Sequence, residues 1–253
     1  MKNPKPHQTR RHFLQTASAA TALALGNSSA TAAPPGVERL TQRLNPKIAD
    51  YRSAAIETLK PNDRDLQHGL ELHADAIVFD SYGFSPRAAV DGDAIKFAIE
   101  AGASSAEIDD LREDAGMTRY VTNAVEQQEY RDAWRASGVT CIFQNAGEEG
   151  QDPLRLLKRL ARFTYVTDLM RGFVSKAVTP GDILQAKKEN RHSLCFTGNG
   201  VPLTQQWVSV QDELRYVKIF YQLGIRMMHL TYQRRNMIGD GCAEKANAGL
   251  SDF

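Results

Sequence analysis

The chain has 253 residues, a hydrophobic content of 42% and a formal net charge of +1. This length suits one large α/β domain or two small ones, and the apolar content is enough to bury a sizeable core. Acidic and basic residues are interspersed beyond the N-terminus, which argues against a nucleic-acid partner or an acidic surface as a partner.

The first 32 residues have the features of an export signal. A basic region ending in Arg10 and Arg11 is followed by an apolar stretch from Phe13 to Leu25 and by an A-x-A-like cleavage site at residues 30–32. The run TRRHFL matches the twin-arginine export pattern. The apolar stretch is shorter than the about 20 residues that a membrane span requires. We therefore predict a twin-arginine signal peptide over residues 1–32, a periplasmic or secreted protein, and no stable membrane span.

Residues 33–72 are predicted to form a helical lead-in, with breaks at Pro46 and Pro61. From residue 73 onward, apolar strands alternate with helical segments, which is typical of parallel βα units. The predicted strands lie in DAIVFDSYG, VTCIFQNAG, HSLCFTGNG and RMMHLTY, and the first is expected to be buried over residues 76–79. The predicted helical segments are 91–137, 153–176, 180–190 and VQDELRYVKIFYQLG at 210–224, with Gly224 as the C-cap of the last one.

Polar or glycine residues follow each predicted strand on its C-terminal side, which is the active face of a (β/α)8 barrel. Four βα units make about half of such a barrel. The sequence therefore predicts an α/β fold of TIM type, with an incomplete (β/α)8 barrel over residues 73–253.

Cysteines and histidines offer no metal site by their spacing. The three cysteines are an odd number, and Cys141 and Cys195 lie in apolar runs, so both are predicted to be buried free thiols. His73 and His192 precede their strands, at the face where a barrel performs no chemistry. His229 stands three residues before Tyr232, so strand alternation predicts that it points to the opposite side.

The last third of the chain resembles the membrane (renal) dipeptidase family, whose members are zinc-dependent barrels that hydrolyse dipeptides. The segments that carry the resemblance are YQLGIR at 221–226, LTY at 230–232, Asn236, and GLS at 249–251. The strand end at residues 80–84 and the segment AWRASGVTCIFQ match the family's first two strands in position. The resemblance spans residues 65–253, about the first half of a family domain, and it implies a barrel of the metallohydrolase kind.

The sequence departs from the family at its metal-binding positions. By position, the histidine and aspartate of the first strand become Tyr82 and Phe84, and the bridging glutamate becomes Thr197. The substrate-contacting histidine of the "L-T-H" motif is Tyr232. A phenylalanine offers no donor to zinc, and a neutral hydroxyl is a poor one. The resemblance implies zinc as the family's cofactor, but the residues of this chain predict none.

Three functions therefore stay open. The first is a dipeptidase-like hydrolase with a reduced or altered metal site, in which Tyr232 is the catalytic residue and the hydroxyl of Tyr232 or Tyr82 stabilises an oxyanion. The second is a metal-free pseudoenzyme that binds a small peptide-like ligand, and the third is a truncated fragment without function. The predicted substrate-binding residues are Asp80, Tyr82, Thr197 and Asn236.

Two further expectations concern the surroundings of this site. Arg234 and Arg235 follow the fourth predicted strand, where they either hold a substrate carboxylate or belong to a solvated loop. An incomplete barrel leaves strand edges open, which predicts aggregation or an edge-to-edge homodimer.

Overall fold

A computed structural model describes residues 37, 40, 45–147, 152–206 and 208–253 of the chain. The predicted signal peptide over residues 1–32 lies outside the described residues. Within the predicted lead-in, the described residues form α3 (Pro46–Leu59) and α4 (Asp63–Asp75), and α4 extends beyond residue 72. Asn45 caps α3, Pro46 begins it, and Pro61 lies in the connection between the two helices, as the sequence predicts.

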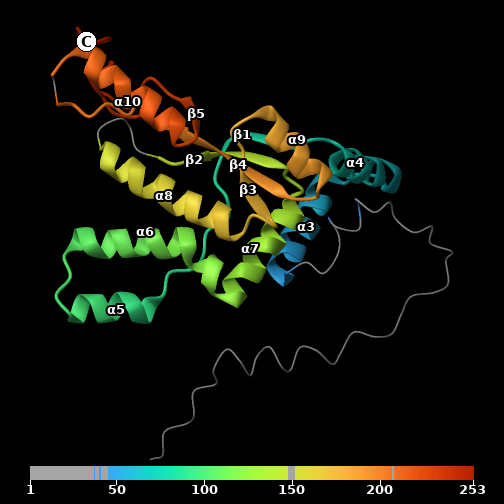
Figure 1. Cartoon of the computed structure of the whole chain (residues 1–253). Helices are drawn as coiled ribbons and strands as arrows, with labels where there is room; N and C mark the ends of the chain where they lie inside the picture. Colours follow the sequence, from blue (N-terminus) through green and yellow to red (C-terminus); the bar gives the residue numbers. More distant parts are fainter. Residues whose placement is uncertain (1–36, 38–39, 41–44, 148–151, 207) are drawn as a thin grey trace, which may run out of the picture. The chain divides into compact units, whose positions relative to one another are not determined.

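The centre of the fold is a sheet of five strands, all of them parallel where they pair (Figure 1). The strands are β1 (Phe79–Gly83), β2 (Cys141–Asn145), β3 (Val174–Lys176), β4 (His192–Gly198) and β5 (Ile225–Met228). Their order is β1-β2-β4-β3, and β5 pairs with β4 as well. The mixed α/β class and the parallel pairing are confirmed.

β3 and β5 share one side of β4. β3 pairs with its first half, where Val174 lies opposite His192, and β5 pairs with its second half, where Gly198 lies opposite Met228. The strands thus end at one edge of the sheet, and this edge carries the candidate site. Within the described residues β1 does not pair with β5, so the sheet does not close into a barrel there.

The predicted segment 91–137 is three helices: α5 (Gly92–Glu100), α6 (Ser105–Thr122) and α7 (Ala124–Ser137). A capping box of Ser104 and Glu107 begins α6, and Asn123 caps α7. Both caps accept hydrogen bonds from backbone N–H groups that have no partner at the start of a helix. A new helix therefore begins at each cap, although the sequence pattern predicted one long segment.

Three more helices complete the βα units: α8 (Pro153–Leu169), α9 (Pro180–Lys188) and α10 (Val210–Gln222). Thr179 caps α9, and Gly224 follows α10 with a φ of 113°, a backbone conformation that L side chains rarely adopt. The helix expected over 153–176 is too long: it ends at Leu169, and the chain continues into β3. No helix in the described part of the chain is long and apolar enough to cross a membrane.

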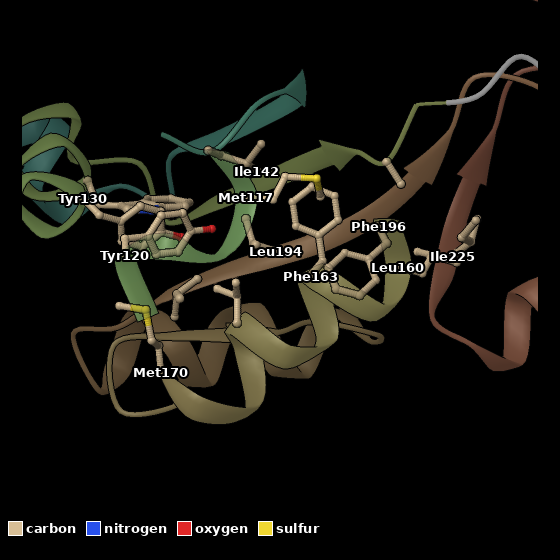
Figure 2. Close-up of a cluster of buried hydrophobic side chains, with 14 of the residues drawn as sticks. Met117, Tyr120, Tyr130, Ile142, Leu160, Phe163, Met170, Leu194, Phe196 and Ile225 are labelled. Carbon is tan, nitrogen blue, oxygen red and sulfur yellow. The ribbon is translucent and has the colours of Figure 1, made fainter. Parts of the chain in front are cut away.

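The core lies between one face of the sheet and helices α6, α7 and α8. Leu160 and Phe163 on α8 point toward Leu194 and Phe196 on β4, and the two phenylalanine rings are 5.7 Å apart (Figure 2). Arg162, on the same helix, binds α6 through Asp110, Glu113 and Asp114. Apolar packing and this ion network together fix α6 against α8.

The first strand differs from its prediction in place and in burial. It begins at Phe79, not at Ala76, and includes the polar residues that were expected to form a turn. Ile77 is 45% exposed and Phe79 is 39% exposed. Among the described strands, β1 pairs only with β2 and is an edge strand. The prediction that its apolar residues are fully buried was therefore wrong.

Candidate functional site

The C-terminal ends of four strands bring a group of polar and aromatic side chains together. Tyr82 is on β1, Asn145 ends β2, Asn199 follows β4, and His229 and Tyr232 follow β5. The strand register places these ends at the same height, because Asn145 lies opposite Thr197 and Gly198 lies opposite Met228. In open α/β sheets this edge is where ligands bind.

The Tyr82 hydroxyl is held between two side-chain amides. Asn145 Nδ2 donates a hydrogen bond of 2.8 Å to it, and the hydroxyl donates to Asn199 Oδ1. Burial, followed by the neighbouring Tyr232 hydroxyl, raises the pKa of Tyr82 to about 12. Tyr82 is therefore a neutral phenol at neutral pH and serves as a hydrogen-bonding group rather than as a base.

The rings of Tyr82, His229 and Tyr232 lie together at this edge of the sheet. Tyr82 stacks on His229 with ring centroids 5.1 Å apart and an interplanar angle of 26°. Tyr232 lies 5.8 Å from His229 and 6.4 Å from Tyr82, measured between ring centroids. The backbone carbonyl of Tyr232 accepts a hydrogen bond of 2.7 Å from Cys242 N–H, which fixes the loop that carries it.

The position of His229 overturns the prediction that it points away from Tyr232. β5 ends at Met228, so residues 229–232 are not a strand and the alternation of strand side chains does not apply to them. An imidazole thus belongs to the candidate site. The other histidines match their structural interpretation: His73 Nε2 bonds the Ser137 carbonyl at 2.8 Å, and His192 Nδ1 bonds the Val139 carbonyl at 2.7 Å.

The remaining predicted site residues lie in different settings. The exposed Asp80 accepts a hydrogen bond of 3.1 Å from Tyr82 N–H at Oδ1, so its carboxylate organises the end of β1. Thr197 is fully buried, and its hydroxyl donates to the Gln144 carbonyl at 3.3 Å. Asn236 donates from Nδ2 to the Leu230 carbonyl at 2.9 Å and accepts from Ile238 N–H at 2.8 Å.

Through these hydrogen bonds Asp80, Thr197 and Asn236 stabilise the backbone around the site. Thr197 lies beneath the strand ends and has no open surface for a ligand. Asn236 stabilises a loop and also lines a separate cavity of about 790 Å³. Of the predicted site residues, the structure brings only Tyr82 and Tyr232 together.

Zinc, the cofactor that the resemblance implies, does not fit the residues present. The three side chains at its expected ligand positions are a phenol bonded to two amides (Tyr82), an exposed phenyl ring (Phe84), and a buried hydroxyl bonded to a carbonyl (Thr197). None of them is a nitrogen, sulfur or carboxylate donor of the kind zinc uses. The described residues contain no group of three or more His, Cys, Asp or Glu side chains that could hold a metal ion.

A cavity of about 290 Å³ lies next to the strand ends. Asn145 and Asn199 belong to its wall, so the two amides that hold Tyr82 also face this cavity. Its other lining residues come from the loop after β1, from β2 and the segment after it, from α6 and α8, and from the loop after β5, and several of them are arginines.

Sequence reasoning missed Asn145 and Asn199 as partners of Tyr82. The signal that could have found them is their position, because both stand at or directly after a C-terminal strand end. Their pairing with Tyr82 depends on the neighbour relations β1-β2-β4, which the order of the strands in the sequence does not give.

The chain is similar to a crystal structure of an amidohydrolase from Pseudomonas aeruginosa, with 20% sequence identity and a TM-score of 0.43. The similarity covers 72% of this chain and 42% of that protein, so this chain spans less than half of its length. No family model matches the chain, and neither does any curated protein. At this level the likeness concerns the course of the backbone and does not identify a reaction.

Proposed function

We propose that this chain belongs to an exported, dipeptidase-like protein whose strand ends bind a small peptide-like ligand without the family's metal. The observation that carries the proposal is the Tyr82 hydroxyl, held by Asn145 and Asn199 at a position where the resemblance expects a metal ligand. Because this hydroxyl both accepts and donates a hydrogen bond within the protein, it has a structural role. It shapes the edge of the sheet and leaves the binding groups to its neighbours.

Tyr232 is the proposed ligand-contacting residue. Its ring lies 6.4 Å from that of Tyr82, on a loop at the end of β5. Its hydroxyl can donate a hydrogen bond, which suits the carbonyl oxygen of a peptide-like group. The stacked rings of Tyr82 and His229 add a flat apolar surface, the kind of wall that small-molecule sites commonly have.

A second candidate function is hydrolysis of an amide bond in an altered site, and His229 favours it. An imidazole is the side chain that general acid–base catalysis uses most often. In this alternative His229 moves a proton to or from the attacking water or the leaving group, and the Tyr232 hydroxyl stabilises the oxyanion. The two candidates share the same residues and differ in whether the ligand is consumed.

The test combines calorimetric titration of L-alanyl-L-alanine with an assay for free alanine, both in the presence of EDTA. Binding that is weakened by Tyr232→Ala, without release of alanine, supports the binding protein. Release of alanine that is lost in His229→Gln supports the hydrolase. Tyr165→Phe, on the exposed face of α8, is the matched control and should change neither readout.

A panel of dipeptides and small amides that shows neither binding nor turnover contradicts both candidates. The periplasmic or secreted location is part of the same proposal. Its support is the sequence of residues 1–32, in which TRRHFL precedes an apolar stretch and a cleavage site.

A further inference from the structure

The cavity of about 290 Å³ beside the strand ends has an unusual concentration of guanidinium groups. Arg87, Arg155, Arg159 and Arg234 line it, and Glu113 is the single carboxylate among its described lining residues. Its apolar wall is formed by Met117, Tyr120 and Phe163, which are labelled in Figure 2, together with Phe84. The cavity therefore combines one apolar side with a positively charged rim.

The loop that carries Arg87 is fixed at both ends. Ser85 N–H donates a hydrogen bond of 2.7 Å to the buried Gln144 Oε1, and Ala88 N–H donates one of 2.9 Å to the Gly116 carbonyl on α6. Because these bonds hold the backbone on either side of Arg87, the point from which its side chain extends is set before any ligand arrives. Such preorganisation lowers the entropy cost of binding.

Two glycines make room for two of the guanidinium groups. A Cβ atom at Gly116 would lie 2.9 Å from Arg87 Nη2, and a Cβ atom at Gly147 would lie 1.9 Å from Arg159 Nη1. Gly147 has a φ of 69°, which also favours glycine. The backbone therefore admits the guanidinium groups at places where any other residue would displace them.

Glu113 is already occupied by other arginines. Arg159 Nε donates to its Oε1 at 2.9 Å, and Arg162 Nη1 donates to its Oε2 at 2.8 Å. Burial raises the pKa of the Glu113 carboxyl, but the hydrogen bonds and charges of Arg159 and its neighbours outweigh this effect and hold it below its usual value. Glu113 is thus a carboxylate engaged with α8, and it is not a counter-ion for Arg87.

The Arg87 guanidinium forms no hydrogen bond or ion pair with any residue in the part of the chain that the structure describes. Arg155, across the cavity, has a 55% exposed side chain and reaches Glu113 only at 3.5 Å, so most of its donors also stay open. Tyr120 also lines the cavity, and its pKa is raised first by burial and then by the neighbouring Tyr130. The guanidinium groups of Arg87 and Arg155 can only donate hydrogen bonds, so a ligand that satisfies them must accept.

We propose that this cavity binds the oxyanion group of a small molecule, a carboxylate or a phosphate, through Arg87 and Arg155, with Arg159 held in place behind them by Glu113. A guanidinium group matches both kinds of oxyanion with paired, charge-assisted hydrogen bonds. The volume is near the lower end of the about 300–1,000 Å³ of small-molecule pockets, which suits a compact ligand. This site goes beyond the proposed function, because its binding groups come from α6, α8 and the loop after β1 rather than from Tyr82, His229 and Tyr232.

The experiment is a calorimetric titration with inorganic phosphate and, separately, with acetate at constant ionic strength. Arg87→Gln should weaken the binding of the preferred anion by about tenfold or more, the usual effect of losing one charge-assisted contact. Arg112→Gln removes the same charge from the exposed side of α6, outside the cavity wall, and should leave the affinity unchanged. The anion that binds more tightly identifies the ligand group as a phosphate or as a carboxylate.

A second variant tests the geometry without removing a charge. Gly116→Ala places a methyl group against the Arg87 guanidinium and should weaken binding, while alanine suits a helix better than glycine. Denaturation by urea should show that both cavity variants stay folded. Equal anion affinity in Arg87→Gln and Arg112→Gln overturns the proposal, and so does the absence of binding of either anion to the unaltered chain.

Discussion

The side-chain amide of Asn145 donates a hydrogen bond of 2.8 Å to the hydroxyl of Tyr82, 63 residues earlier in the chain. Because the same hydroxyl donates to Asn199, one oxygen atom joins the ends of β1, β2 and β4. The edge of the sheet thus depends on a side chain that the family resemblance associates with metal binding.

Tyr82→Phe should lower the free energy of unfolding by about 1–3 kcal/mol, because it leaves two amide groups at the strand ends without their partner. Urea denaturation followed by circular dichroism measures the change. Tyr165→Phe removes an exposed hydroxyl from α8 and should shift the stability by no more than about 0.5 kcal/mol. Equal stability of the two variants would show that the amide contacts contribute nothing.

Because His192 is partly buried, we expect the stability of the fold to decrease as the pH falls. Burial lowers its pKa from 6.5 to about 4, and the charge of Arg135 adds to this, although its bond to the Val139 carbonyl acts in the opposite direction. Between these values the unfolded chain binds a proton that the folded chain does not, so stability falls as the pH falls.

From pH 7 to pH 5 this single group should cost about 2 kcal/mol of stability. His192→Gln should show a smaller loss over the same interval, measured by urea denaturation at both pH values. His68→Gln changes an exposed histidine of α4 and should retain the slope of the unaltered chain. If His192→Gln retains that slope as well, His192 is not buried in its neutral form.

Arg162→Gln should destabilise the fold by about 2 kcal/mol or more, because it leaves Asp110, Glu113 and Asp114 without their shared partner. The Arg162 side chain is 9% exposed and that of Glu113 is 15% exposed, so solvent replaces little of this contact, whereas Asp110 and Asp114 are 44% and 55% exposed and become solvated. Arg112→Gln, whose pair with Asp109 is exposed, should cost no more than about 0.5 kcal/mol. Thermal melting of both variants measures the difference, and similar melting temperatures would argue against the network as a link between α6 and α8.

The open edge of β1 leads us to expect self-association of the chain. β1 is an edge strand, and Ile77, Phe79 and Phe84 are exposed beside it. Light scattering should show a mass that rises with protein concentration, and Ile77→Lys should shift the chain toward the monomer. A monomer at all concentrations, with one cooperative melting transition, would contradict the prediction that this edge pairs or aggregates.

Export is tested by replacing Arg10 and Arg11 with lysine, which should leave the protein in the cytoplasm. Fractionation of cells that express the two forms measures the distribution. Normal arrival of the double variant in the periplasm would exclude the twin-arginine route.

The sequence predicted the alternation of strands and helices, because local signals such as Pro46, Thr179 and Gly224 mark where helices begin and end. It failed at β3, since a three-residue strand has too few residues to show a period. It also failed on the exposure of β1, which depends on which strands lie beside it.

In the candidate site, too, the sequence predicted some residues and missed others. Tyr82 and Tyr232 were identified through the family resemblance, at positions that follow the predicted strands. Asn145, Asn199 and His229 join them only through the sheet order and through the end of β5 at Met228. The arginine-lined cavity depends on contacts between α6, α8 and the loop after β1, which no local pattern in the sequence encodes.

The central claim is that the strand ends form a ligand site that works without zinc. The most direct measurement is calorimetric titration of the purified chain with L-alanyl-L-alanine, once with excess EDTA and once with added zinc. The account predicts the same affinity in both conditions, and weaker binding in Tyr232→Ala in either. Binding or alanine release that disappears with EDTA and returns with zinc would contradict it.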